Sequence, residues 1–217
     1  MENVLYVSDL TGKCLWKITI ETDDQHQNVI KWLTLDYQPF TLSMSGGGQV
    51  LVNSHTGSIL RIYGSNAELR QSIQLPRDVE KPIHAVETSV GNFIILHWWM
   101  DEKAAESGRN GEWLRVISEL SRDGQIVVRR FIPSNEALIS PRYFSLDSDD
   151  RVFAADTDNG RLILLDFDLR WNRDICPANE VNKSQIMLPC RLYYDEDMKQ
   201  LIISGSFENG ANVYTFS

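Results

Sequence analysis

Short runs of apolar and β-branched residues recur along the chain, separated by polar stretches. Five of these runs start 45, 43, 59 and 49 residues apart and cover residues 5–9, 50–54, 93–97, 152–156 and 201–205. β-Branched and aromatic residues suit a pleated, half-buried surface, so each run predicts a β-strand. The regular spacing predicts a repeated structural unit.

A second strand-like run follows most of the first ones after a turn glycine. The glycines are Gly12, Gly57, Gly160 and Gly210, and the runs after them begin at residues 14, 59, 162 and 212. Glycine supplies the positive φ that tight hairpin turns need. The pattern therefore predicts a hairpin that is repeated around the fold.

A proline precedes each later unit, in phase with the strands. These prolines are Pro39, Pro82, Pro141 and Pro189. Proline is tolerated at the first residue of a strand, so each one predicts the start of another strand. Candidate fourth strands lie at 29–35, 69–75, 125–131 and 184–188.

Four antiparallel strands in ~45 residues are typical of one blade of a β-propeller. We predict an all-β chain, a single propeller domain over 1–217, with units near 1–38, 39–81, 82–140, 141–188 and 189–217. The longest interval contains a charged segment, 100–112, which we interpret as an insertion between two strands of one blade. A β-sandwich is the alternative, but it has no reason to repeat its turn residues in phase.

The segment 140–166 resembles an NHL repeat. Pro141, Asp147, a strand ending in Asp156 and an Arg161-led strand lie at the places that the family pattern gives them. The first unit matches in part, and the other units carry Ser54, His97 and Gly205 where the strand-ending Asp is expected. NHL propellers usually have six blades, whereas this chain offers about five NHL-like units, the first without an inner strand and the last without an outer one. We therefore predict an incomplete or irregular ring.

The NHL resemblance implies a binding role. In TRIM-NHL ubiquitin ligases the propeller recruits substrates or RNA, and a separate RING domain carries the activity. The three scattered cysteines of this chain, Cys14, Cys176 and Cys190, cannot build a RING. We expect a non-catalytic scaffold for protein interaction, of the type that recruits substrates within a larger ubiquitin-ligase-like protein.

The charge balance favours a protein partner over RNA. The chain has 21 Lys and Arg against 30 Asp and Glu, a net charge of −9. Nucleic-acid binding needs a concentrated positive surface, so an RNA-binding propeller is kept only as an alternative. No apolar run approaches the ~20 residues of a membrane span, and the start lacks a signal-peptide pattern, so we expect a cytoplasmic protein. The sequence does not decide the oligomeric state.

Five residues are candidates for a binding surface. Trp99 and Trp113 flank the charged insertion, and Arg129, Arg130 and Arg142 form the main local concentration of basic residues. Exposed aromatic side chains beside a long loop are typical interface anchors. Trp98, adjacent to Trp99 on the same strand, points to the opposite face and is expected in the core.

A metal-dependent propeller lyase or lactonase is the enzymatic alternative. It would require His55, His84, His97 and Asp156 to converge on one ion at about 2.0–2.5 Å. Their places within the units differ, which favours separately packed side chains, and Asp156 at a strand-to-turn corner is typical of a turn cap. We therefore expect no cofactor. A further alternative is a fragment without independent function, with an exposed apolar edge.

Overall fold

A computed structural model of the chain describes residues 3–20, 27–45, 47–54, 57–100, 113–125, 127–132, 141–176, 189–205 and 211–215. The described part contains five antiparallel sheets, each built from strands that are consecutive in the chain. The first sheet has three strands, β1 (Asn3–Asp9), β2 (Cys14–Ile20) and β3 (Gln27–Thr34), and the second has four, β4 (Pro39–Ser45), β5 (Gln49–Ser54), β6 (Ile59–Tyr63) and β7 (Leu69–Gln74).

The other three sheets follow in the same order. The third comprises β8 (Glu80–Glu87), β9 (Phe93–Met100), β10 (Trp113–Leu120) and β11 (Val127–Phe131). The fourth comprises β12 (Pro141–Leu146), β13 (Val152–Asp156), β14 (Arg161–Leu165) and β15 (Trp171–Cys176), with the short 3-10 helix η1 (Thr157–Asn159) between β13 and β14. The fifth comprises β16 (Pro189–Asp195), β17 (Gln200–Gly205) and β18 (Ala211–Thr215).

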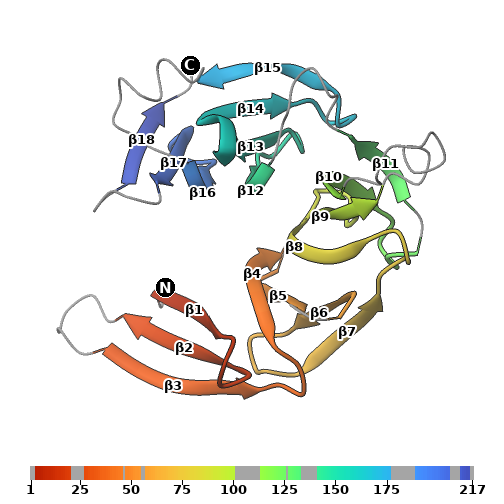
Figure 1. The fold of residues 1–217 in the computed structure, drawn as a ribbon. Coiled ribbons are helices and arrows are strands. Elements are labelled where there is room, and N and C mark those ends of the chain that lie inside the picture. Colours follow the sequence, from red (N-terminus) through yellow and green to blue (C-terminus); the bar gives the residue numbers. More distant parts are fainter. Residues whose placement is uncertain are drawn as a thin grey trace.

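The five sheets stand side by side in an arc (Figure 1). The strands β1, β4, β8, β12 and β16 lie on the inside of the arc, and neighbouring members of this set contact one another. Blades arranged in this way around an axis form a β-propeller. The predicted all-β class and the five repeated units are therefore confirmed.

The predicted fourth strand at 184–188 was wrong. Its place in the fourth sheet is taken by β15, which pairs with β14. The turn between these strands is tight because Asp166 accepts hydrogen bonds from the backbone N–H groups of Asp168 and Arg170. β15 therefore follows β14 at once, and residues 184–188 lie outside the described part.

The charged segment falls between two paired strands. β9 ends at Met100 and β10 begins at Trp113, and the two strands pair along their full length. Residues 101–112, which join them, lie outside the described part.

Apolar side chains fill the spaces between neighbouring sheets. Every residue of β13 is buried. Val152 and Ala154 pack into the cluster shared with the third sheet, whereas Phe153 and Ala155 pack into the cluster shared with the fifth sheet. Because successive side chains of a strand point to opposite faces, one strand contributes to two interfaces.

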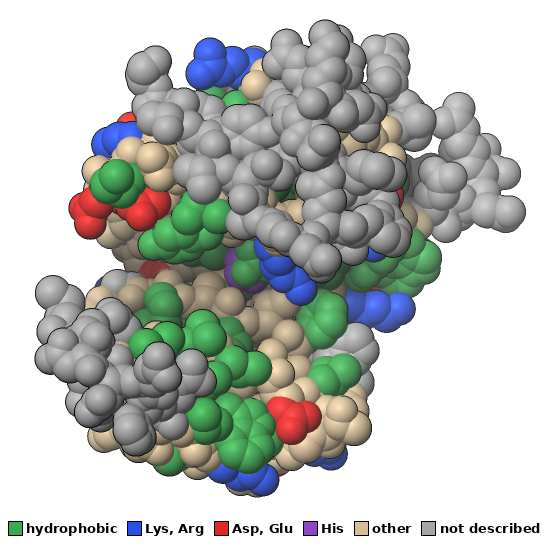
Figure 2. Space-filling view, turned by 90° about the vertical axis from the view of Figure 1, so that its left-hand side faces the viewer, with side chains coloured by type: hydrophobic (Ala, Val, Ile, Leu, Met, Phe, Trp, Pro, Cys, Tyr) green, Lys and Arg blue, Asp and Glu red, His purple; other side chains and the backbone are tan. Residues whose placement is uncertain are grey.

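The first sheet has one face that the described residues leave exposed. Leu5 and Val7 are 52% and 39% exposed, whereas Val50 and Val52, at the same places in β5, are fully buried. The first and last sheets do not adjoin (Figure 1), and the view from that side shows hydrophobic side chains on the lower half of the molecule (Figure 2). The open arc agrees with the predicted incomplete ring. Within the described ranges, no helix has the length and apolar character that a membrane crossing requires.

Carboxylates link the turns that follow the inner strands. Asp150 accepts hydrogen bonds from the N–H and hydroxyl groups of Ser89, at 2.8 and 2.6 Å, and so joins the third and fourth sheets. Glu196 binds the same two groups of Ser148, at 3.1 and 2.8 Å, and joins the fourth and fifth. Asp147, which is buried, accepts from two backbone N–H groups and from the Arg151 side chain. This end of the blades is held by local, charge-assisted hydrogen bonds.

Candidate functional site

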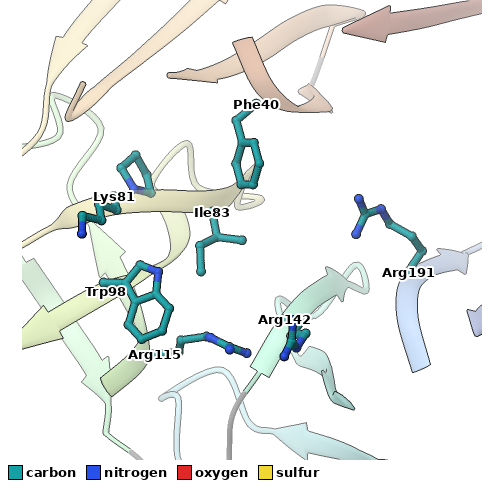
Figure 3. A pocket seen from close by; sticks show the side chains of 8 residues that line it. Phe40, Lys81, Ile83, Trp98, Arg115, Arg142 and Arg191 are labelled. Atoms are coloured by element: carbon teal, nitrogen blue, oxygen red, sulfur yellow. The ribbon is translucent and has the colours of Figure 1, made fainter. Parts of the chain in front are cut away.

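A pocket of about 690 Å³ lies where the inner strands begin (Figure 3). Its walls come from the second, third, fourth and fifth sheets, so it exists only when these blades are assembled. This volume is within the usual range for small-molecule and side-chain sites. The lining residues are Phe40, Lys81, Pro82, Ile83, Trp98, Arg115, Arg142 and Arg191.

Irregular strand starts turn several of these side chains into the pocket. In four of the five inner strands, β4, β8, β12 and β16, the pairing register shifts close to the proline. The shifts lie between Pro39 and Leu42, Glu80 and His84, Pro141 and Tyr143, and Pro189 and Arg191. Phe40, Ile83 and Arg142 each follow such a proline directly and lie inside the shifted segment. Bulges of this kind bend the strand and re-aim its side chains, as is common beside functional sites.

Among the described residues, the pocket is lined by four cations and by no acidic side chain. Arg115 comes from β10, Arg142 from β12 and Arg191 from β16, so three sheets contribute one guanidinium each. Asp158 in η1 orients two of them. Its Oδ1 accepts from Nη2 and Nε of Arg142 at 2.7 and 3.1 Å, and its Oδ2 lies 3.7 Å from Nη1 of Arg115. Figure 3 shows Arg115 reaching below Trp98 towards Arg142.

Aromatic rings lie against three of the four cationic groups. The Arg115 guanidinium carbon lies 5.0 Å from the Trp98 ring centroid, and that of Arg191 lies 4.8 Å from Tyr143. The ammonium group of Lys81 lies 5.3 Å from the ring of Trp113. Cation–π contacts at these distances restrict the side chains without neutralising their charge. Burial lowers the pKa of Arg115, and the nearby charge of Arg142 acts in the same direction.

His84 lies behind this pocket and does not add to its charge. Its ring is buried, stacked on Tyr143 at a centroid distance of 4.1 Å, and its Nδ1 has no hydrogen-bond partner among the described residues. Burial and, to a smaller extent, the positive charge of Arg191 lower the pKa of His84 to about 3. The imidazole is therefore neutral at physiological pH.

Of the five predicted binding residues, the structure places only Arg142 in the pocket. Arg129 donates to the carbonyl of Phe167 and pairs with Glu119 and Asp168, and Arg130 pairs with Asp78. Both are engaged in holding the third sheet to its surroundings. Trp99 is half-buried with its ring centroid 5.7 Å from the guanidinium carbon of Arg130, and Trp113, 38% exposed, borders the pocket through Lys81.

The structure does not bring the candidate metal ligands together. His97 donates from Nδ1 to the carbonyl of Trp98 and accepts at Nε2 from Ser118, both at 2.8 Å, and burial lowers its pKa to about 4. Asp156 accepts hydrogen bonds from Asn159 and Arg161, as a turn cap would. His55 lies outside the described residues, among which no cluster of three or more potential ligands occurs.

Sequence reasoning missed most of the pocket. It expected Trp98 in the core, but Trp98 stands at the end of β9 and lines the cavity. The sequence does contain one usable signal, because three lining residues directly follow the repeated prolines. The lining residues that were missed are Phe40, Lys81, Pro82, Ile83, Arg115 and Arg191.

The chain has similar folds among solved structures but no match by sequence. No protein-family model and no curated protein sequence matches it. It is similar to a chain in the crystal structure of a nidogen/laminin complex, with a TM-score of 0.65 and 15% identity over 98% of this chain and 71% of that one. A functionally unknown protein from Desulfotomaculum acetoxidans gives a TM-score of 0.60 and 13% identity, over 98% and 62%.

A protein of unknown function from Bacteroides caccae gives a TM-score of 0.52 and 9% identity, over 99% of this chain and 73% of that one. Identities this low show the β-propeller fold alone. None of these similarities is specific to NHL repeats.

Proposed function

We propose that this chain is a non-catalytic platform for protein interaction, and that its pocket holds an acidic segment of the partner. The observation that carries the proposal is the lining of the pocket, to which the described part of the chain contributes four cations from three sheets and no acidic residue. Arginine presents its donors in a planar fork that matches the two oxygens of a carboxylate. A segment with two or more Asp or Glu side chains would bind several of these groups at once.

The cationic side chains are held in place before a partner arrives. Asp158 binds Arg142, and aromatic rings lie against Arg115 and Arg191. The strands that carry them belong to sheets whose interfaces are filled with buried apolar residues. Preorganised groups lose less conformational entropy on binding, so more of the interaction energy contributes to affinity.

The overall charge agrees with a local rather than an extended recognition site. The chain carries a net charge of −9, and salt screens the field of the pocket cations within roughly 10 Å. A short acidic segment needs only that local field, whereas an RNA backbone needs a long positive track.

The similar fold in a nidogen/laminin complex, which is an assembly of proteins, supports a protein partner. The resemblance of segment 140–166 to an NHL repeat supports a narrower role, the recruitment of substrates within a larger ubiquitin-ligase-like protein.

Selection from a displayed library of random dodecapeptides tests this proposal. We expect the wild-type chain to enrich peptides with several Asp or Glu residues. The affinity of synthetic copies, measured by isothermal titration calorimetry, should fall at least tenfold for the Arg142→Gln/Arg191→Gln double variant. Both arginines are exposed, so the variant should keep its circular dichroism spectrum and its thermal unfolding midpoint. Enriched peptides without acidic residues, or peptides that bind the double variant equally well, would overturn the proposal.

A further inference from the structure

In the part of the chain that the structure describes, the first sheet has a vacant position beside β1. β1 is the terminal strand of this sheet, whose order is β1-β2-β3, and it pairs with β2 on one side. Its other edge presents backbone N–H and C=O groups to which no described strand is paired. An edge of this kind is a template for an added strand.

β1 corresponds to the second strand of the later sheets and not to their first. Tyr6 of β1 and Leu15 of β2 pack into the cluster shared with the second sheet. Leu51 of β5 and Leu60 of β6 pack in the same way into the cluster shared with the third sheet. β1 therefore takes the place of β5. The inner position, which β4 fills beside β5, is not filled by any described strand of the first sheet.

The four other sheets show which kind of segment fills the inner position. In each of them it is occupied by a strand with a proline at or near its start, β4, β8, β12 or β16, paired antiparallel with the second strand. The residue three places after the proline is apolar in every case and lies opposite a residue of the second strand. These residues are Leu42, Ala85, Phe144 and Leu192. The repeat therefore selects an extended segment with a proline and an apolar residue three places later.

The vacant position adjoins an open apolar face. Leu5, Ile18 and Val29 form one row across the three strands of the first sheet, so their side chains lie on the same face. Leu5 and Val29, at the two ends of the row, are each 52% exposed. Figure 2 shows a hollow between the lower and upper halves of the molecule, with hydrophobic side chains of the lower half beside it. An added strand would extend this row at the Leu5 end.

We infer that the first sheet binds an extended, proline-led segment of a partner protein, which adds to β1 as an antiparallel inner strand. The apolar side chain three residues after the proline would lie opposite Val7, as Leu42 lies opposite Val52 in the second sheet. In strand addition, main-chain hydrogen bonds supply affinity and alternate side chains supply specificity. This surface is separate from the proposed function, because it does not use the cations of the pocket.

A second copy of the chain is a poorer match to the vacant position. The free edge of a second copy would be β1, which contains no proline. The four proline-led strands of that copy are already paired within their own sheets. A segment of another protein has neither restriction.

A peptide that copies residues 38–45 is a suitable probe, since it contains the proline pattern and no charged side chain. It is capped at both ends, labelled with a fluorophore and titrated with the chain, and binding is followed by fluorescence anisotropy. We expect saturable binding, at least tenfold tighter than that of a scrambled peptide of the same composition. Equal binding of the two peptides would overturn the inference.

Methylation of the peptide backbone distinguishes strand pairing from apolar adhesion. In a strand added at an edge, only the N–H groups of alternate residues point towards the neighbouring strand. N-methylation of one alternate set should therefore weaken binding at least tenfold, and N-methylation of the other set less than threefold. The two sets are the copies of Phe40, Leu42 and Met44 and the copies of Thr41, Ser43 and Ser45. Equal effects of both sets would show that the peptide does not pair as a strand and would contradict the inference.

Two matched variants locate the bound strand. Leu5→Lys and Val29→Lys change equally exposed residues at opposite ends of one row, and both variants should keep the circular dichroism spectrum of the wild type. Leu5→Lys should weaken the peptide at least fivefold, and Val29→Lys less than twofold. Equal losses would place the peptide on the open face and not at the edge of β1, and would contradict the inference.

Two further measurements separate the alternatives. Arg142→Gln should leave the affinity for this peptide unchanged, so the strand site and the pocket can fail independently; a large loss would move the peptide to the pocket and overturn the inference. Size-exclusion chromatography with light scattering should show a monomer at micromolar concentration. A dimer that the peptide does not dissociate would make a second copy the occupant, which would also overturn it.

Discussion

The two ends of the inner strands differ in both regularity and charge. Where these strands begin, shifted registers turn Phe40 and Arg142 into a pocket lined by cations. Where they end, tight turns carry carboxylates that are bound by the protein's own donors, as Asp150 is by Ser89. The turns after the inner strands are therefore regular and join the blades, whereas the irregular starts of these strands direct side chains into the pocket. Stability and recognition are placed at opposite ends of one scaffold.

The largest expected difference between the ends is in the free energy of unfolding. Asp147→Ala should lower it by about 3 kcal/mol, because two backbone N–H groups and the Arg151 guanidinium lose a buried acceptor. Arg142→Gln, at the other end, should change it by less than about 0.5 kcal/mol, as exposed ion pairs contribute little. Urea unfolding followed by tryptophan fluorescence measures both. Equal destabilisation by the two changes would contradict the claim that the turn end contributes more to stability than the pocket end.

As the pH falls, groups near the pocket end should lose their contribution to the free energy of unfolding at a higher pH than Glu196 at the turn end. The folded-state pKa values of His84 and His97 are lowered to about 3 and about 4, so below pH 6.5 the unfolded state binds protons that the folded state does not. The free energy of unfolding should therefore fall between pH 6.5 and pH 5, by up to about 1.4 kcal/mol per pH unit for each histidine. Hydrogen bonds from Lys199 and Ser148 lower the pKa of Glu196 to about 2, so its contribution is complete above pH 4.5 and is lost only as the pH falls towards 2.

Urea unfolding at pH 7.5, 6.5, 5.5 and 5.0 tests this pH dependence. His84→Phe keeps an aromatic ring against Tyr143 and should remove about half of the slope below pH 6.5. A free energy of unfolding that stays constant from pH 7.5 to pH 5.0 would contradict the burial of the two neutral imidazoles.

A smaller effect is expected where one carboxylate joins two sheets. Asp150→Asn should lower the free energy of unfolding by about 1 kcal/mol, because the amide replaces one charge-assisted acceptor of Ser89. Asparagine is chosen since residue 150 has a φ of 59°, a conformation that Asn adopts more readily than most residues. Asp197→Asn, on the exposed turn of the fifth sheet, is the control and should leave stability unchanged.

The smallest effects on stability are expected from exposed apolar residues at either end. Val90→Ser should change the free energy of unfolding by less than about 0.5 kcal/mol, because the side chain is 71% exposed, and Phe40→Ser, at 37% exposed, should lower it by about 1 kcal/mol. Only Phe40→Ser should weaken an acidic peptide selected on the wild-type chain, by a few-fold. A comparable loss of affinity for Val90→Ser would show that the turn end also takes part in binding.

The repeat could be predicted because strands and turns leave local signals in the sequence, and the missed strand shows where such signals stop. The prediction used a glycine to mark the turn of one hairpin in each unit and had no such marker for the fourth strand. The turn before β15 uses Leu169 with a φ of 56° instead, so no glycine marks it. Hydrogen bonds to Asp166 stabilise this turn, and they are visible only in the folded chain.

The pocket could be predicted only in part because its residues meet across sheets. Arg142 stood out beside other basic residues, but Arg129 and Arg130 proved to be engaged with Asp168 and Asp78. Whether an arginine points into a cavity depends on the strand registers around it. Those registers are set by packing between blades, which leaves no pattern within a single unit.

The most direct test of the account is the affinity of one selected acidic peptide for Arg142→Gln and for Arg129→Gln, measured by titration calorimetry against the wild type. Both changes remove one positive charge, and both positions were candidates in the sequence, but only Arg142 lines the pocket. We predict at least a tenfold loss of affinity for Arg142→Gln and less than a twofold change for Arg129→Gln. An equal loss for both variants would mean that the peptide responds to overall charge and not to the pocket, and would contradict the account.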